Sequence, residues 1–335
     1  MPDLILHHYP MSPFAEKARL MLGFKGLAWK SVFIPSVMPK PDVVALTGGY
    51  RRTPLLQIGA DIYCDTALIA TVLEHLKPPF AGPPQERQHP LGGPGEARVG
   101  GEVPVLFPEH LKGVTRIVAQ WADSTLFWAA MGHTLSPKGA AAMFGSQPPE
   151  VGQAFAADRS AMRNGMTGLR AGDAASAYRS YLRRLAHMLH EQPFLFGDAP
   201  CIADFAAYHP LWFTRVVNPA MAGILDATPG VLAWMDRMAA LGHGQPTKFT
   251  STEAIAVAAA AEPAPLADEA FQDDHGIPLG SRVTVAAESF GPETTEGTLL
   301  ASTRTHYTLE RTDDRAGRVH VHFPRIGYVL KEVRA

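Results

Sequence analysis

The order of strand and helix patterns at the start of the chain limits its fold more than any other feature. Short apolar runs such as LILHHY (4–9) and AWKSVFI (28–34) predict strands, whereas 13–24 places its apolar residues on one helical face. Pro13 stands in the first turn of that helix, where a missing N–H costs no hydrogen bond. We expect strands at 4–9, 28–34, 53–59 and 60–64, and helices at 13–24, 41–48 and 65–76. The order βαβαββα predicts a three-layered, thioredoxin-like α/β domain over residues 1–78.

Beyond this domain the composition and the periodicity change twice. Residues 79–101 are so rich in proline and glycine that they predict a linker. Helical periodicity then dominates residues 102–262, which predicts an all-α domain. Residues 275–335 contain short alternating runs separated by Gly and Asp turns, which is the pattern of a small antiparallel β-barrel. With 335 residues, the chain is expected to be a multidomain α+β protein.

The charge balance and the cysteine content exclude several classes of function. The net charge is −2, so no basic field attracts nucleic acid or an anionic membrane. No apolar run approaches the roughly 18 residues that span a bilayer, and the N-terminal run is too short for a signal peptide. Cys64 and Cys201 form no C-x-x-C motif, which excludes a dithiol redox motif and a cysteine-rich zinc site. We expect a cytoplasmic protein with reduced, inert thiols.

Ser12 is the first candidate functional residue. It stands immediately before Pro13, at the expected start of a helix. A serine in this place commonly caps its own helix. The free N–H groups of a helix N-terminus also stabilise an anion, to which the hydroxyl could donate a hydrogen bond. Both roles remain open from this position alone.

Two later segments offer complementary groups. Asp65 and Thr66 open another helix, where they can cap it, bind an anion or, through the carboxylate, receive an amino group. Arg51 and Arg52 precede Pro54, a position compatible with a cis bond. Their guanidinium groups suit a carboxylate, with a solvated pair as the alternative. Together these features predict a cradle for a small zwitterion with several carboxylates and a central thiol.

Three segments in this order, SPFAEKARLML, RRTPLLQIG and CDTALIATVLE, resemble the thioredoxin-like domain of cytosolic glutathione S-transferases. The Ser-Pro-Phe start is most similar to the serine-type and omega-like branches. The helical region carries LFGDAPCIADFAAY, which resembles the family's capping box. Asp204 matches the aspartate of that box, whereas Cys201 stands where Ser or Thr is usual, so the reciprocal cap is weakened or replaced by a backbone arrangement. The resemblance covers about residues 1–245 and implies a homodimeric, glutathione-dependent transferase of the detoxification type.

The resemblance assigns roles to the matching residues. Ser12 matches the residue that activates the thiol, and it would donate a hydrogen bond to the glutathione thiolate rather than act as a nucleophile. Omega-like members have cysteine there, so this serine argues against thiol reduction through a mixed disulfide. The resemblance implies that the other candidates bind glutathione: Thr53 and Pro54 its cysteinyl part, Asp65 and Thr66 its γ-glutamyl group, and Arg51 and Arg52 its glycyl carboxylate.

The second substrate and the C-terminal strands carry weaker signals. Phe127 and Trp128 are candidates for the pocket of a small hydrophobic electrophile, although aromatic residues at helical spacing more often belong to the core. His320 and His322 lie on one strand face, but no third ligand is evident, so no metal is expected. A nucleic-acid module would need a basic stripe and stacking aromatics. Two alternatives stay open: a non-catalytic glutathione-binding carrier or assembly protein, and a glutathione-dependent isomerase or lyase.

Overall fold

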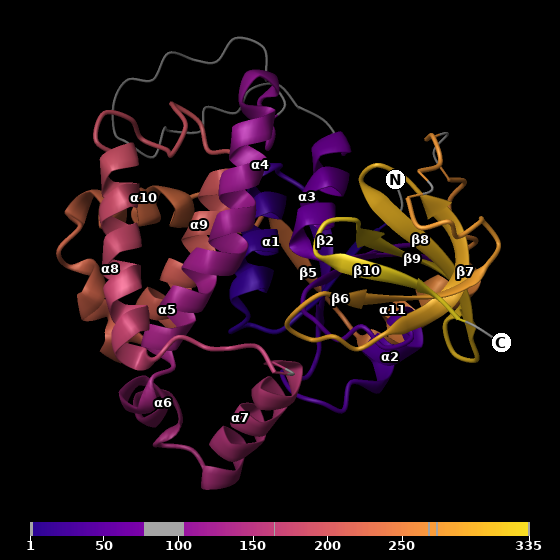
Figure 1. Ribbon diagram of the computed structural model, residues 1–335, viewed down its shortest axis with the longest axis horizontal. Coiled ribbons are helices and arrows are strands. Elements are labelled where there is room, and N and C mark those ends of the chain that lie inside the picture. The colour runs from indigo at the N-terminus through magenta and orange to yellow at the C-terminus, as the bar shows by residue number, and fades with distance from the viewer. Residues whose placement is uncertain (1–2, 77–103, 164, 267–268, 273, 334–335) are drawn as a thin grey trace.

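The computed structural model describes residues 3–76, 104–163, 165–266, 269–272 and 274–333. The linker expected at 79–101 lies outside the described residues. Figure 1 shows the helical domain on one side of the molecule, the C-terminal strands on the other, and the first domain between them. Every helix in the described part of the chain is too short or too polar to cross a membrane.

The first domain has the element order that the sequence predicted. Its elements are β1 (Leu4–His8), α1 (Pro13–Phe24), β2 (Ala28–Phe33), α2 (Pro41–Thr47), β3 (Leu55–Ile58), β4 (Asp61–Cys64) and α3 (Thr66–His75). β1 pairs in parallel with β2 and antiparallel with β3, which pairs antiparallel with β4. Leu4 and Leu6 of β1 join the core that includes α1 and α3, whereas Ile5 joins the core on the opposite face. The alternation in the sequence therefore sets which face of the sheet each residue covers.

The helical domain packs against α1 and α3 through one large core. Its helices are α4 (Lys112–Trp121), α5 (Phe127–Thr134), α6 (Pro137–Phe144), α7 (Pro149–Arg163), α8 (Ala171–Met188), α9 (Ile202–Trp212) and α10 (Pro229–Ala239), with a π-helical segment (Ala122–Leu126) between α4 and α5. Asp204 caps the buried helix α9, since its Oδ2 accepts from Cys201 N at 3.0 Å. Its Oδ1 accepts from Leu195 N and Trp234 Nε1, each at 2.9 Å. The Asp204 part of the expected cap therefore forms although Cys201 replaces the usual Ser or Thr.

Near the end of the expected helical domain one element differs from the prediction, whereas the trailing helix expected from the alanine-rich run after residue 250 forms. Gln245–Phe249 is a strand, β5, that pairs in parallel with β2. The sequence QPTKF has no apolar alternation and is largely exposed, so nothing in it indicated a strand. Helix α11 (Ser251–Ala260) packs on α2, β2 and β9. Its narrow buried stripe of Ala254, Ile255 and Ala258 belongs to the core on the sheet face opposite α1.

The C-terminal strands extend the sheet of the first domain. They are β6 (Arg282–Ala287), β7 (Thr295–Ser302), β8 (His306–Asp313), β9 (Gly317–Pro324) and β10 (Tyr328–Glu332). Neighbours among them are antiparallel, as expected, and β9 pairs in parallel with β4. The described strands form one ten-stranded sheet in the order β10-β6-β7-β8-β9-β4-β3-β1-β2-β5. This order has two open ends, so closure into a barrel stays a prediction.

The C-terminal strands also share a core with the first domain. α2, α11 and apolar residues from all five C-terminal strands belong to one buried cluster. The loop after α2 meets the start of β7 closely, because a Cβ on Gly49 would lie 2.1 Å from the Thr294 carbonyl oxygen. Thr295 Oγ1 donates to the Thr47 carbonyl oxygen at 2.8 Å. These contacts make the C-terminal strands an integral part of the body that carries the candidate site.

Candidate functional site

Ser12 lies at the N-cap of α1, and only 2% of it is exposed. Its Oγ accepts a hydrogen bond from Ala15 N at 3.2 Å, which is the capping role. A hydroxyl that accepts through its oxygen still carries a hydrogen that it can donate. The two roles that the sequence left open are therefore compatible, because Ser12 can cap α1 and also donate to an anion at its positive end.

Asp65 is the only non-glycine residue with a positive φ among the described residues, at 73°. A backbone of this kind costs energy for a residue with a Cβ, and such strain concentrates at functional sites. The Oδ1 of Asp65 accepts from Ala67 N at 2.9 Å and caps α3, while Oδ2 accepts from the Tyr328 hydroxyl at 3.0 Å. Burial and the Asp65 charge raise the pKa of Tyr328 well above its usual value, so this hydroxyl stays protonated. Thr66 follows in the first turn, where its Oγ1 accepts from Lys17 Nζ at 3.2 Å.

The two arginines have different surroundings. Arg51 is buried, with Nη1 2.7 Å from Asp158 Oδ1 in α7 and Nε 2.6 Å from Glu293 Oε1 in the loop between β6 and β7. Arg52 is partly exposed, and its Nη1 lies 3.8 Å from Asp65 Oδ2. Two carboxylates of the protein therefore engage Arg51, while Arg52 is held more loosely. Of the pair, Arg52 is the better candidate for a ligand carboxylate.

A buried lysine lies beside the prolyl turn. The Thr53–Pro54 bond is cis, which the sequence allowed. Lys40 Nζ donates to Thr53 Oγ1 at 3.3 Å and to the Arg51 carbonyl oxygen at 3.2 Å. Burial, together with the Arg159 charge, lowers the pKa of Lys40 to about 8. Lys40 is thus a further cation of the site, and no sequence motif marked it.

Helix α7 supplies a second contact that sequence reasoning missed. Arg159 Nη2 donates to the Tyr9 hydroxyl at 3.2 Å and to the Ser36 carbonyl oxygen at 2.9 Å. The Tyr9 carbonyl oxygen accepts from Ser12 N at 3.1 Å, so Arg159 is linked to the segment that holds Ser12. Tyr9 and Ser36 lie 150 and 123 residues from Arg159 in the sequence, and no local pattern could indicate either contact.

The polar side chains around the expected site carry an excess of positive charge. They come from the first domain, from α7 and from the loop between β6 and β7. The cations are Lys40, Arg51, Arg52 and Arg159, and the carboxylates are Asp65, Asp158 and Glu293. This balance suits an anionic ligand.

The two aromatic candidates lie in different surroundings. Phe127 is buried, and its ring centroid lies 4.8 Å from that of Phe14 and 5.8 Å from that of His209. It belongs to the core between α1 and the helical domain. Trp128 is half-buried, and its ring lies 5.1 Å from Phe290 in the loop between β6 and β7. The C-terminal region therefore reaches the helix from which the electrophile pocket was expected.

The remaining sulfur and histidine candidates are buried. Cys64 and Cys201 are free thiols whose pKa is raised by burial, which agrees with inert cysteines. His320 and His322 are also buried, and the structure places Asp61 beside them as a third donor. No local pattern indicated this third residue, because Asp61 and His322 are 261 residues apart in the sequence.

Comparison with known proteins agrees with this arrangement. The family profile of the glutathione S-transferase N-terminal domain matches residues 6–84, and that of the C-terminal domain matches residues 153–237. A solved structure of a GST-like protein from Pseudomonas syringae is 41% identical, with a TM-score of 0.75, over 99% of this chain and 100% of that chain. The chain belongs to the glutathione S-transferase family. Because the likeness covers almost the whole chain, it includes the C-terminal strands of this glutathione S-transferase family member.

Two further solved structures are similar at low identity. Beta-etherase LigF from Sphingobium sp. strain SYK-6 is 16% identical, with a TM-score of 0.49, over 71% of this chain and 95% of that chain. FzlA from C. crescentus is 18% identical, with a TM-score of 0.46, over 70% of this chain and 87% of that chain. A search of curated proteins found no match to the chain.

Proposed function

We propose that this glutathione S-transferase family member binds glutathione between α1, the Pro54 turn and α3, and that Ser12 donates a hydrogen bond to the glutathione thiolate. The observation that carries this proposal is that Ser12 accepts from Ala15 N through its oxygen, which leaves its hydrogen for a ligand. A free thiol has a pKa of about 8.5, and a helix N-terminus with a hydroxyl donor stabilises the thiolate. The sulfur then forms a bond to an electrophilic carbon of a small hydrophobic substrate, and the leaving group departs with its bonding electrons.

The first domain offers a suitable group for each part of glutathione. The Asp65 carboxylate would receive the γ-glutamyl ammonium group, and Thr66, at the N-terminus of α3, would bind the adjoining carboxylate. The backbone of Thr53, beside Pro54, would pair with the cysteinyl part. Arg52 would bind the glycyl carboxylate, and Arg51 would support that position through its ion pairs.

The electrophile would lie against Trp128, which faces Phe290 from the C-terminal region. Phe127 would line this pocket from the core side, because its ring is 5.0 Å from that of Trp128. An apolar wall of this kind suits a small hydrophobic substrate. We place the reaction in the cytoplasm and expect a homodimer, with neither nucleic acid nor membrane as a partner.

One observation favours a second candidate, a non-catalytic glutathione-binding carrier or assembly protein. Arg51 and Asp65 already have partners within the chain, namely Asp158, Glu293 and Tyr328. A ligand must therefore compete with these contacts or add to them.

A glutathione-dependent isomerase or lyase needs the same site and differs only in the second substrate.

The test compares two serines that each precede a proline at a helix start. Ser12 starts α1 in this way, and Ser136 starts α6. We expect Ser12→Ala to lower kcat/KM for thioether formation by about tenfold or more, since one hydrogen bond to the reacting anion is lost. The Kd of glutathione in calorimetry should change by less than about threefold, because Ser12 would contact only the sulfur atom of glutathione. Ser136→Ala should change neither value.

Three outcomes separate the candidates. No heat of binding at millimolar glutathione, with no retention on immobilised glutathione, would reject both the enzyme and the binding protein. Binding without product from a panel of electrophiles would favour the carrier. An unchanged turnover in the Ser12→Ala protein would remove Ser12 from the reaction while leaving the binding site in place.

A further inference from the structure

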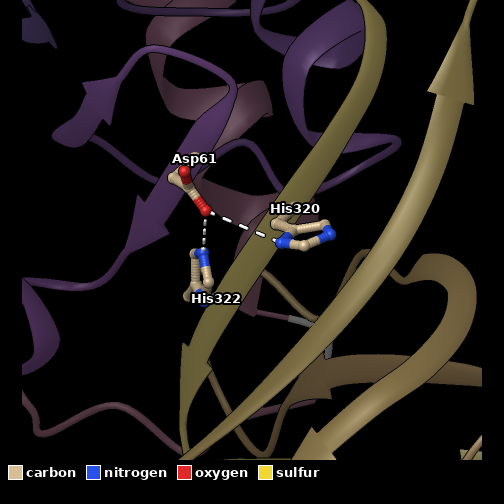
Figure 2. Close-up of side chains that lie close together, drawn as sticks. All are labelled: Asp61, His320 and His322. Atoms are coloured by element: carbon tan, nitrogen blue, oxygen red, sulfur yellow. Dashed lines mark hydrogen bonds and ion pairs between the residues drawn. The ribbon is translucent and has the colours of Figure 1, made fainter. Parts of the chain in front are cut away.

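Three side chains gather where the C-terminal strands join the first domain. Asp61 and His320 are partners across the parallel strands β4 and β9, and His322 follows two residues later on the same face. Figure 2 shows both imidazoles directed at one carboxylate oxygen. His322 Nε2 lies 2.9 Å from Asp61 Oδ1, and His320 Nδ1 lies 3.7 Å from the same atom. All three residues are buried, with exposed fractions of 4%, 8% and 6% for Asp61, His320 and His322.

The spacing of these donor atoms fits a metal ion. Zinc binds imidazole nitrogen and carboxylate oxygen at about 2.0–2.1 Å, so tetrahedral geometry puts its ligand atoms roughly 3.3 Å apart. The two distances from Asp61 Oδ1 lie on either side of this value. One donor atom from each of the three residues lies within 4.8 Å of the others. A small movement of the His320 ring would bring the set to binding distance.

Each of the three side chains has a second polar atom, which would not bind the metal. That atom lies near a group that would fix the orientation of the side chain. Asp61 Oδ2 accepts from Ala264 N at 2.8 Å, which leaves Oδ1 for the shared position. His322 Nδ1 lies 2.9 Å from Thr308 Oγ1, and His320 Nε2 lies 3.7 Å from Glu310 Oε2. Metal-binding histidines commonly donate their second ring N–H to a hydroxyl, carbonyl or carboxylate in this manner. Tyr63 stacks on His322, with ring centroids 4.5 Å apart, and fixes its plane.

One ring nitrogen of His320 lacks a hydrogen bond among the described residues. This nitrogen, Nδ1, is buried. A buried polar atom without a partner costs free energy, and native proteins rarely keep one without a reason. This nitrogen points toward Asp61 Oδ1, as the dashed line in Figure 2 indicates. A cation between them would give this nitrogen a partner, and it would replace the hydrogen bond that joins Asp61 Oδ1 to His322 Nε2.

We infer that Asp61 Oδ1, His320 Nδ1 and His322 Nε2 bind a divalent transition metal, and that zinc is the ion that fits best. Two imidazoles and one carboxylate are a donor set that zinc accepts, with water or another ligand in a fourth position. The same donor set binds non-haem iron(II), but that ion needs several open positions, and the burial of all three residues leaves little room for them.

The position of the metal gives it a role in the structure. It would join β4 of the first domain to β9 of the C-terminal region, which is the only pairing among the described strands that connects the two sets. β4 leads directly from Asp61 through Cys64 to Asp65, so the metal would hold the strand that positions Asp65. This role does not depend on glutathione chemistry, and the metal can be measured without any activity.

The test measures zinc on the purified full-length chain without a histidine tag. After dialysis against EDTA and addition of zinc, we expect gel-filtered protein to hold about one zinc per chain by elemental analysis and to unfold at a higher Tm than the metal-free form. Cobalt(II) in its place should give the visible absorption of a tetrahedral site. The key variant is His320→Gln, because His320 Nδ1 has no hydrogen bond within the described residues to lose and the fold should survive. Its zinc Kd should be at least about tenfold weaker.

His306→Gln is the matched control. His306 lies on the neighbouring strand β8 with its ring 6.3 Å from that of His322, but its Nδ1 contacts Thr303 and Thr305. This variant should bind zinc as the parent protein does. The inference is overturned if the folded parent protein takes up no zinc at micromolar concentrations, or if His320→Gln binds zinc with an unchanged Kd. Circular dichroism of each sample establishes that it is folded.

Discussion

Arg51 Nη1 and Asp158 Oδ1 form a 2.7 Å ion pair in which both side chains are at least nine-tenths buried. The pair connects the turn before β3 to helix α7. Glu293, from the C-terminal region, adds a second carboxylate beside Arg51. Three parts of the chain thus meet at one guanidinium group. A residue that the family resemblance associates with a ligand carboxylate also holds the protein together.

Replacing Arg51 by Met should lower the free energy of unfolding by about 3 kcal/mol, because buried carboxylates lose their countercharge. The exposed pair of Arg282 and Glu296 provides the control, and Arg282→Met should change stability by less than about 0.5 kcal/mol. Urea unfolding of both variants measures the difference. If Arg51→Met were as stable as the parent protein, the ion pair would contribute nothing to the free energy of unfolding. The role of Arg51 would then be confined to ligand binding.

The parts of the site that the sequence predicted are those set by local rules. The caps at Ser12 and Asp65 follow from the residues that start a helix, and the strands follow from alternation within a few residues. Asp158, Glu293 and Tyr328 could not be predicted in this way. Each reaches its partner only after distant segments have packed, and Tyr328 meets Asp65 across 263 residues.

Gly49 allows the C-terminal region to dock on the first domain. A Cβ there would lie 2.1 Å from the Thr294 carbonyl oxygen, so Gly49→Ala must displace the start of β7. We expect a loss of about 2–3 kcal/mol in unfolding free energy from this overpacking. Gly113→Ala is the control, because a Cβ on Gly113 in α4 meets no atom within 4 Å. It should be neutral or should stabilise the helix by up to about 1 kcal/mol. Equal stability of the two variants would show that the loop after α2 can move away from Thr294 without loss of unfolding free energy.

His7 makes the stability of the protein depend on pH. Burial lowers its pKa from 6.5 to about 4, although a hydrogen bond with Gln57 opposes the shift. Between these two values the unfolded chain binds a proton that the folded chain does not, so acidification destabilises the fold. The loss from His7 should reach about 3 kcal/mol by pH 4. Burial also lowers the pKa of His8, to about 3, which adds in the same direction.

The measurement is urea unfolding at a series of pH values between about 4.5 and 6. His7→Gln keeps a side chain that can donate to Gln57 and removes one titrating group. The slope of unfolding free energy against pH should fall by about 1.4 kcal/mol per pH unit. His110→Gln, in an exposed position of the helical domain, should leave the slope as it is. An unchanged slope in the His7→Gln protein would mean that the folded protein already binds this proton.

Asp204 should contribute more to stability than Cys201, the N-cap residue of α9. Its two oxygens accept from Leu195 N, Trp234 Nε1 and both the backbone N–H and the thiol of Cys201, so Asp204→Ala leaves four buried donors without this acceptor. We expect a loss of about 3–5 kcal/mol, which is a large part of the roughly 5–15 kcal/mol that stabilises a typical native protein. Cys201→Ser restores the usual capping residue and should change unfolding free energy by less than about 1 kcal/mol, because Cys201 N already donates to Asp204. Thermal and urea unfolding of both variants test this contrast. If Asp204→Ala lowered the free energy of unfolding by less than about 1 kcal/mol, water would replace the carboxylate as the acceptor inside the helical core.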